Sequence, residues 1–196
     1  LRTAGELLLI GGGAHRTGDN AYGGQYKKLE GAAARWWPGS KEAFRWSAQD
    51  CMTLDGVPYI GRFSARKQNW YVATGFQKWG MTSSMVSAMI LSDQICGEKN
   101  PYEEVFSPQR HIGRSAAGSL IKESGHTAAT LAKPSKLPEE RKENVRTSRC
   151  SHLGCHLSWN PDEKTYECPC HGSRFDCKGR VTDGPAQKDI SVGGES

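Results

Sequence analysis

The residues best suited to chemistry in this sequence lie in two short fragments near its end. Cys150-Ser151-His152-Leu153-Gly154-Cys155 is followed, after twelve residues, by Cys168-Pro169-Cys170-His171-Gly172-Ser173. Together the fragments offer two thiolates and two imidazoles. This donor set suits a two-iron two-sulfur centre in which His replaces Cys on one iron, and the less donating imidazole raises the reduction potential of that iron. Such a centre would accept one electron at a time.

A structural zinc site is the alternative, because two Cys and two His also satisfy tetrahedral zinc. The single residue between Cys150 and His152 is tighter than the usual zinc-finger spacing. A zinc finger also has no need of Cys155 and Cys170. The spacing therefore favours iron and sulfide, with zinc as the less favoured reading.

At these fragments the sequence resembles the Rieske family. The resemblance implies four iron ligands: Cys150 and Cys168 on one iron, and His152 and His171 on the other. It also implies a disulfide between Cys155 and Cys170. Gly184-Pro185-Ala186 matches the proline-containing loop that shields the cluster in that family.

Two further positions bear on the reduction potential. Ser173 matches a hydroxyl that, in many members of the family, donates a hydrogen bond to a bridging sulfide. Phe175 stands where high-potential members often carry Tyr. Because hydrogen bonds to the sulfurs are one lever on the potential, the loss of the Tyr donor predicts a lower potential.

A second candidate site lies in the first half of the chain. The β-rich run 69–76 enters the glycine loop Gly80-Met81-Thr82, and a buried helix is predicted directly after it, ending at Gly97. Its apolar face is predicted to contain Met85, Met89, Ile90 and Ile95. A strand, a glycine-rich turn and a helix start in this order direct backbone N–H groups at an anionic or carbonyl oxygen.

With Asp55-Gly56-Val57-Pro58-Tyr59-Ile60-Gly61 upstream, this region resembles the end of FAD-dependent oxidoreductases of the D-amino-acid oxidase and glycine oxidase class. The resemblance covers roughly residues 5 to 107 and implies that the loop and helix start cover the flavin ring. The implied contacts are Gly75, Phe76, Gly80, Met81 and Thr82. The amino-terminal nucleotide-binding unit of that class is not in this sequence, so FAD is expected in the full-length protein.

The other elements follow from periodicity and turn residues. Residues 7–10 predict a buried strand entering Gly11-Gly12-Gly13, after which His15 and Arg16 either approach a cofactor or belong to a structural turn. A helix is predicted from Gly24 to Pro38, and strands at 44–52 and 56–62, with Trp46 and Tyr59 packing in the fold. Part of 111–132 is predicted to be helical, and 175–181 to form a hairpin turn.

The fold class predicted is α+β: the C-terminal part of an FAD-dependent oxidoreductase domain with mixed strands and helices, then a small all-β Rieske domain. The predicted domains are 1–107, a helical and Pro-, Lys- and Glu-rich connector at 108–149, and 150–196. Rieske domains usually have several strands before the first cluster motif, and there is no room for them after Pro134, so either residues are missing there or the domain is cut down; a closing strand is also predicted to be absent. Because the sequence starts with Leu directly before an apolar run, we expect a fragment of a longer protein.

The composition and charge of the chain exclude several classes of protein. The balance of 36% hydrophobic and 24% charged residues is ordinary for a globular protein, and a net charge of +5 gives no segment basic enough for nucleic acid. No apolar run predicts a membrane span or a signal peptide. The odd number of leftover cysteines, Cys51, Cys96 and Cys177, argues against secretion, so a cytoplasmic location is expected.

The function predicted is that of a flavin-dependent oxidoreductase. Electrons would pass between FAD and a Rieske cluster, from a small-molecule substrate, plausibly an amine or amino acid, to an unknown acceptor. No residue is predicted as a general base. The alternatives are an electron-transfer Rieske module without its own catalysis and a zinc-stabilised interaction module.

Overall fold

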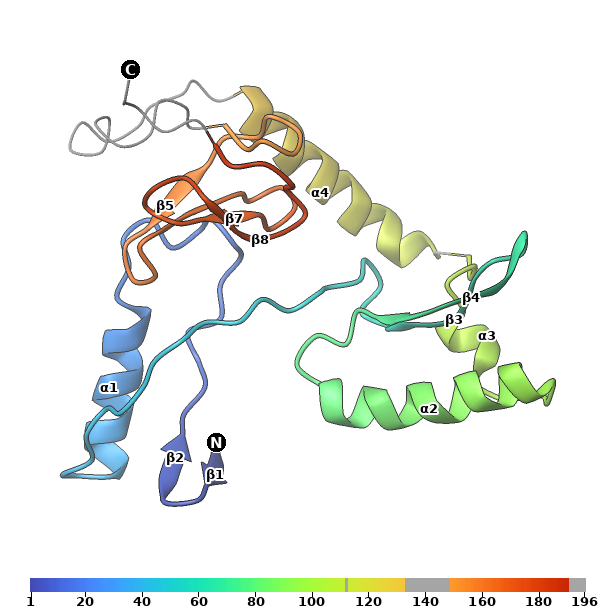
Figure 1. The fold of residues 1–196 in the computed structure, drawn as a ribbon, viewed down its shortest axis with the longest axis horizontal. Coiled ribbons are helices and arrows are strands. Elements are labelled where there is room, and N and C mark those ends of the chain that lie inside the picture. The colour runs from blue at the N-terminus through green and yellow to red at the C-terminus, as the bar shows by residue number, and fades with distance from the viewer. Residues whose placement is uncertain (112, 133–148, 191–196) are drawn as a thin grey trace. The chain divides into compact units, whose positions relative to one another are not determined.

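The two ends of the chain fold together. The computed structural model describes residues 1–111, 113–132 and 149–190 (Figure 1). It divides into two units, one made of Leu1–Ala48 with His126–Ser196 and the other of Gln49–Gly125. The N-terminal segment therefore shares a unit with the predicted cluster-binding region. The domain boundaries predicted at 107 and 150 stay a prediction.

The chain begins with a hairpin of β1 (Arg2–Ala4) and β2 (Leu7–Leu9), which pair antiparallel. The strand predicted at residues 7–10 is confirmed, but its burial is wrong, because the Leu7 side chain is 46% exposed. A sheet of only two strands, as the described residues have here, leaves much of its side-chain surface uncovered.

Helix α1 (Gln25–Trp36) confirms the helix predicted before Pro38. The strand predicted at 44–52 is wrong, because this described segment has no regular structure and no strand pairs with it. Trp46, predicted to pack, is 63% exposed. Aromatic residues favour strands only where a neighbouring strand supplies hydrogen bonds and a surface to pack on.

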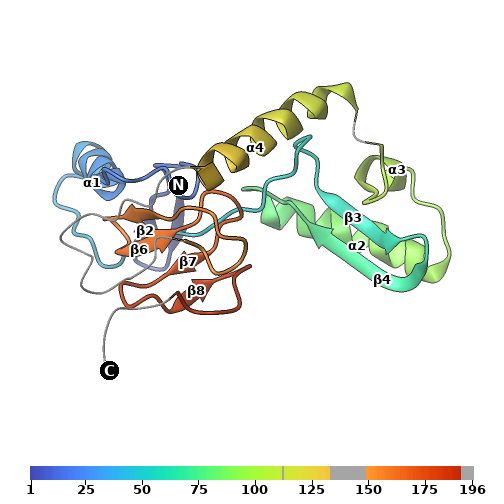
Figure 2. The ribbon, with the colours of Figure 1, turned by 90° about the horizontal axis from the view of Figure 1, so that it is seen from above.

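In the second unit, β3 (Tyr59–Ser64) and β4 (Lys67–Thr74) form an antiparallel hairpin in which Tyr59 pairs with Thr74. Helix α2 (Gly80–Cys96) lies along this hairpin, and the short α3 (Glu103–Phe106) contacts β3 (Figure 2). The strands predicted at 56–62 and 69–76 are thus confirmed, with shifted ends.

An arginine secures the loop before β3. Nη2 and Nε of Arg110 donate to the two carboxylate oxygens of Asp55, at 2.7 and 2.8 Å, and the guanidinium lies 4.0 Å from the centre of the Tyr59 ring. The hydrogen bond from Arg110 lowers the pKa of Asp55 to about 2. Tyr59 therefore packs as predicted, against a cation.

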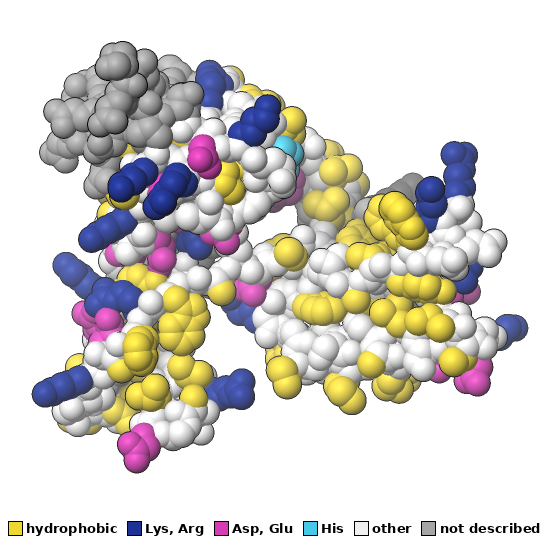
Figure 3. Space-filling model, in the orientation of Figure 1, with side chains coloured by type: hydrophobic (Ala, Val, Ile, Leu, Met, Phe, Trp, Pro, Cys, Tyr) yellow, Lys and Arg dark blue, Asp and Glu magenta, His cyan; other side chains and the backbone are white. Residues whose placement is uncertain are grey.

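Helix α2 ends at Gly97 as predicted, with a left-handed φ of 76° at that residue. Its predicted apolar face is confirmed at Ile90 and wrong at Met85, Met89 and Ile95. The buried residues are Ser83, Ser87 and Ile90, whereas Met85 and Met89 are 67% and 59% exposed, and hydrophobic side chains gather along this helix in Figure 3. The buried Ser87 hydroxyl donates to the Ser83 carbonyl at 2.7 Å, so a small polar face can pack against the hairpin.

Helix α4 (Arg114–Ala132) confirms the helix predicted within 111–132, and residues 133–148 of the predicted connector lie outside the described residues. No helix in the described parts of the chain has the length and apolar character that crossing a membrane requires.

The C-terminal sheet is antiparallel with its strands in chain order: β5 (Ser158–Asn160), β6 (Thr165–Glu167), β7 (Arg174–Phe175) and β8 (Val181–Asp183). The predicted small all-β domain and the hairpin turn at 175–181 are confirmed. Residues 191–196 lie outside the described residues, and the predicted absence of a closing strand stays a prediction. The core consists of Cys150, Cys155, Leu157, Tyr166, Cys168, Phe175, Ala186 and Ile190.

Candidate metal centre

Two loops of the same geometry form the centre. In the first, the Cys150 amide donates to the Cys155 carbonyl at 2.8 Å, and the Gly154 amide donates to the Cys150 carbonyl at 2.9 Å. In the second, the amide of Cys168 donates to the Ser173 carbonyl at 2.8 Å, and that of Gly172 to the Cys168 carbonyl at 2.9 Å. Gly154 and Gly172 have φ values of 74° and 86°, which side chains with a Cβ rarely adopt.

A disulfide joins the two loops. It links Cys155 to Cys170 across a Cα–Cα distance of 6.5 Å, within the usual range for such bonds. This is the pairing that the Rieske resemblance implies. Because each loop is closed by its own hydrogen bonds, one cross-link fixes the position of the first loop relative to the second.

The thiols of Cys150 and Cys168 lie side by side in the core. The two side chains are 3% and 1% exposed and hydrogen-bond to each other. This bond lowers the pKa of Cys150 and raises the pKa of Cys168. The His152 amide also approaches the Cys150 sulfur, at 3.5 Å. Backbone N–H groups directed at sulfur favour the thiolate form, which is the form that binds metal.

The imidazoles lie at the surface. The rings of His152 and His171 have centroids 5.0 Å apart and an interplanar angle of 83°, and both residues are exposed. One pair of candidate ligands is therefore buried sulfur, and the other is exposed nitrogen. A cluster with one buried and one solvent-facing iron would need this division.

The donor set fits a Rieske-type cluster. The sulfurs of Cys155, Cys168 and Cys170 lie within 4.8 Å of one another, but the disulfide leaves only Cys168 of these three as a thiolate donor. The donors that remain in the two loops are Cys150, Cys168, His152 and His171. When bound, a [2Fe-2S] cluster supplies one-electron transfer.

Ser173 is fully buried at the base of the second loop. Its oxygen accepts the Ala186 amide at 3.0 Å, and its hydroxyl hydrogen-bonds to the Cys150 thiol. The Gly184-Pro185-Ala186 loop is thereby attached directly to the loop that carries His171. Phe175, with 0% exposure, fills the core and offers no hydroxyl.

The predicted flavin contacts are brought together in part. A pocket of about 270 Å³ is lined by Gly75, Phe76 and Gly80, together with residues of 49–51 and 73–77. Gly75 has a φ of 77°, and a Cβ at this position would collide with Thr53, so glycine is required. Met81 and Thr82 do not line this pocket, and Met81 is 80% exposed.

Sequence reasoning missed a contact beside the second loop. Nε and Nη2 of Arg16 donate to the carbonyl oxygen of Pro169, at 3.2 and 3.1 Å. The glycine run before Arg16 was the only sequence feature that pointed to this residue. It was equally consistent with a cofactor contact and with a structural turn. The leftover Cys51, Cys96 and Cys177 are all exposed and lie outside both loops.

Comparisons with known proteins agree with both parts of the chain. The family model for the Rieske [2Fe-2S] domain matches residues 120–192, and the model for FAD dependent oxidoreductases matches residues 1–94.

Among individual relatives, YhfW of Bacillus subtilis (strain 168), which is described as a candidate Rieske 2Fe-2S iron-sulfur protein, is 35% identical over 94% of this chain. The chain spans 42% of the length of YhfW. Cytochrome b6-f complex iron-sulfur subunit 2 of Trichormus variabilis is 47% identical over 23% of this chain and 25% of its own length. Subunit 3 of Nostoc sp. is 31% identical over 53% of this chain and 54% of its own length.

Proposed function

Because this chain joins a segment of the FAD dependent oxidoreductase family to a Rieske [2Fe-2S] domain, we propose that the protein passes electrons between FAD and a Rieske cluster. The substrate proposed is a small amine or amino acid, in keeping with the oxidase class that the first half resembles. FAD binding is proposed for the full-length protein, and the electron donor or acceptor outside the protein is left open.

The observation that carries the proposal is the pairing of two buried thiols with two exposed imidazoles on hydrogen-bonded loops. In this proposal Cys150 and Cys168 hold one iron, and His152 and His171 hold the other. The Cys155–Cys170 disulfide keeps the loops in place, and the Ser173 hydroxyl donates a hydrogen bond toward the cluster.

Metal and acid-labile sulfide analysis of the anaerobically purified full-length protein is the first test. We expect two irons and two sulfides per chain and, after dithionite reduction, the rhombic low-g electron paramagnetic resonance signal of a His-ligated cluster. Zinc without sulfide would refute the iron–sulfur centre and support a structural zinc site.

Substrate oxidation is tested separately. A panel of amines and amino acids is added anaerobically to the full-length protein while the flavin absorbance and the cluster signal are followed. Flavin bleaching that precedes cluster reduction is the expected result.

An electron-transfer module without its own catalysis is the second candidate. It is favoured by cytochrome b6-f complex iron-sulfur subunit 2 of Trichormus variabilis, which is 47% identical over 23% of this chain, against 35% for YhfW over 94% of the chain. Cluster reduction by an external donor without any substrate-dependent flavin bleaching would support it.

A further inference from the structure

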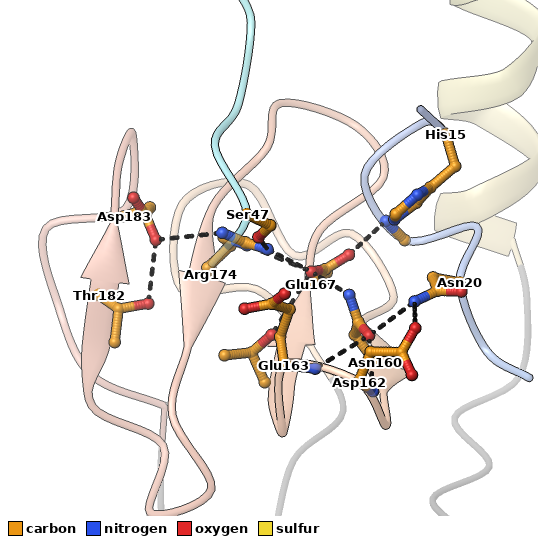
Figure 4. A network of polar contacts seen from close by, with 12 residues as sticks. His15, Asn20, Ser47, Asn160, Asp162, Glu163, Glu167, Arg174, Thr182 and Asp183 are labelled. Atoms are coloured by element: carbon orange, nitrogen blue, oxygen red, sulfur yellow. Dashed lines mark hydrogen bonds and ion pairs between the residues drawn. The ribbon is translucent and has the colours of Figure 1, made fainter. Parts of the chain in front are cut away.

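The oxidoreductase-family segment 15–26 packs on the Rieske domain within one unit of the structure (Figure 4). The Gly18 amide donates to Oε2 of Glu167 at 2.9 Å, and Glu167 is 1% exposed. Oε1 of the same carboxylate accepts hydrogen bonds from Asn160 at 2.8 Å and from Arg174 at 3.0 Å. Because Glu167 immediately precedes Cys168, this buried network ties the segment to the start of the second cluster-binding loop.

A second set of bonds fixes the far end of the segment. Nδ2 of Asn20 donates to Asn160 at 2.9 Å and to Asp162 at 3.0 Å. The Asp162 carboxylate also accepts the backbone amides of Gly24 and Gln25, both at 2.9 Å. A carboxylate at the first amides of a helix satisfies donors that the helix leaves unpaired, so the Rieske domain supplies the N-terminal cap of α1.

The two surfaces also fit by shape. A Cβ at Gly18 would come within 2.9 Å of Pro169, and a Cβ at Gly23 within 2.9 Å of Pro161. Both glycines have positive φ, at 86° and 65°. Glycine is therefore required at both positions for two reasons: the backbone has a positive φ, and a Cβ would collide with a proline ring.

The packing of segment 15–26 on the Rieske domain places the positive charge of Arg16 beside the candidate centre. Its guanidinium makes two hydrogen bonds to the carbonyl oxygen of Pro169, the residue between Cys168 and Cys170. We propose that Arg16, a residue of the oxidoreductase-family segment, is a positioning residue for the iron–sulfur centre that holds the Cys168–His171 loop and raises the reduction potential of the cluster. This inference rests on the proposed Rieske function.

The physical reason is charge. Reduction adds one negative charge to the cluster, and a fixed positive charge nearby stabilises the reduced form more than the oxidised one. The hydrogen bonds to Pro169 hold the guanidinium, and the bond from the Gly18 amide to Glu167 holds the backbone two residues further on. Because Arg16 is half-buried, its charge is only partly screened by solvent.

The test is a redox titration of the cluster in the full-length, cluster-loaded protein, followed by electron paramagnetic resonance. Arg16→Gln removes the charge. Arg16→Lys keeps the charge but cannot reproduce the planar, two-pronged donation. Arg35→Gln removes the same charge from the last turn of α1, outside segment 15–26, where Arg35 lies over the Trp36 ring. Asn20→Ala weakens the docking without changing the charge.

We expect a lower midpoint potential in Arg16→Gln with unchanged iron and sulfide content, a potential closer to wild type in Arg16→Lys, and the wild-type value in Arg35→Gln. Asn20→Ala is expected to shift the potential less than Arg16→Gln. Equal potentials in Arg16→Gln and Arg35→Gln would overturn the proposal.

Loss of iron from both Arg16 variants would overturn the proposed effect on the reduction potential, because Arg16 would then serve only to support the loop. A wild-type protein that contains zinc and no sulfide would instead refute the Rieske function itself, so the two failures are distinguishable.

Discussion

The loops of the candidate centre and helix α2 place their apolar residues in opposite ways. Around the candidate centre, Cys150, Cys168 and Phe175 are at most 3% exposed. On α2, Met85 and Met89 are 67% and 59% exposed, and the buried face contains Ser83 and Ser87. The described residues thus enclose one candidate site and leave the helix beside the other with an open apolar surface.

The difference shows which contacts hold a candidate site together locally. The four candidate cluster ligands lie in two loops that are closed by local hydrogen bonds and joined by one disulfide. The predicted flavin contacts have no such closure, since only Gly75, Phe76 and Gly80 line a common pocket. A substitution in the cluster region should therefore affect the whole region. Substitutions in the α2 region should act independently of one another.

The largest expected effect is at a buried thiol. Cys168→Ser should abolish the cluster, because a hydroxyl is a far poorer ligand for iron than thiolate, with loss of both iron and sulfide and of the visible absorbance. Cys177→Ser is the matched control, because Cys177 is exposed in the turn before β8. Full iron and sulfide content in Cys168→Ser would contradict the ligand assignment.

The burial on α2 is tested by a pair of neighbours. Ile90→Ala should lower the free energy of unfolding by about 2–5 kcal/mol, because Ile90 is 1% exposed and its removal leaves a cavity. Met89→Ala, at a side chain in solvent, should change it by no more than about 0.5 kcal/mol. Chemical denaturation of the full-length proteins measures both, and equal losses would reverse the assigned faces.

A smaller effect is expected from the ion pair before β3. The hydrogen bond from Arg110 lowers the pKa of Asp55 to about 2, below the ordinary value of about 4. The pair therefore contributes about 2 kcal/mol that is fully present above about pH 4 and is lost as the pH falls through about 2. Hydrogen exchange of the β3–β4 amides at decreasing pH should show this decline.

Asp55→Asn supplies the control for that pH dependence, because Asn does not titrate. The variant should be less stable near neutral pH, and its β3–β4 amides should lose this part of the decline at low pH. An unchanged pH dependence in Asp55→Asn would show that another group is responsible.

The smallest expected effect is at the base of the second loop. Ser173→Ala removes a hydrogen bond of about 1 kcal/mol toward the cluster, which corresponds to a midpoint potential lower by about 40 mV at about 59 mV per tenfold for one electron. Phe175→Tyr should shift the potential in the opposite direction if the added hydroxyl reaches a sulfur. Redox titration of both variants checks the pair, and a higher potential in Ser173→Ala would exclude the donor role.

Much of the fold was readable in local patterns. The helices at 25–36 and 114–132, the two strands within 59–74 and the turn after Phe175 were all predicted, because each depends on residues close in sequence. The strand predicted at 44–52 failed because a strand depends on a partner, and none pairs with this described segment. The apolar face of α2 was right at Ile90 and failed at Met85, Met89 and Ile95, because side-chain spacing does not say which face a neighbouring element covers.

For the candidate centre, the sequence by itself determined the donors: their types and spacing lie within two short loops that local hydrogen bonds close. Only the tertiary structure decided that the thiols are buried while the imidazoles are exposed, and that Arg16 lies against Pro169 across 153 residues of chain. The physical reason is how far apart in the sequence the interacting residues are. The ligands are spaced by residues that are close together in the sequence. Burial and docking depend on contacts between segments that are far apart, and no local pattern indicates which segments will meet.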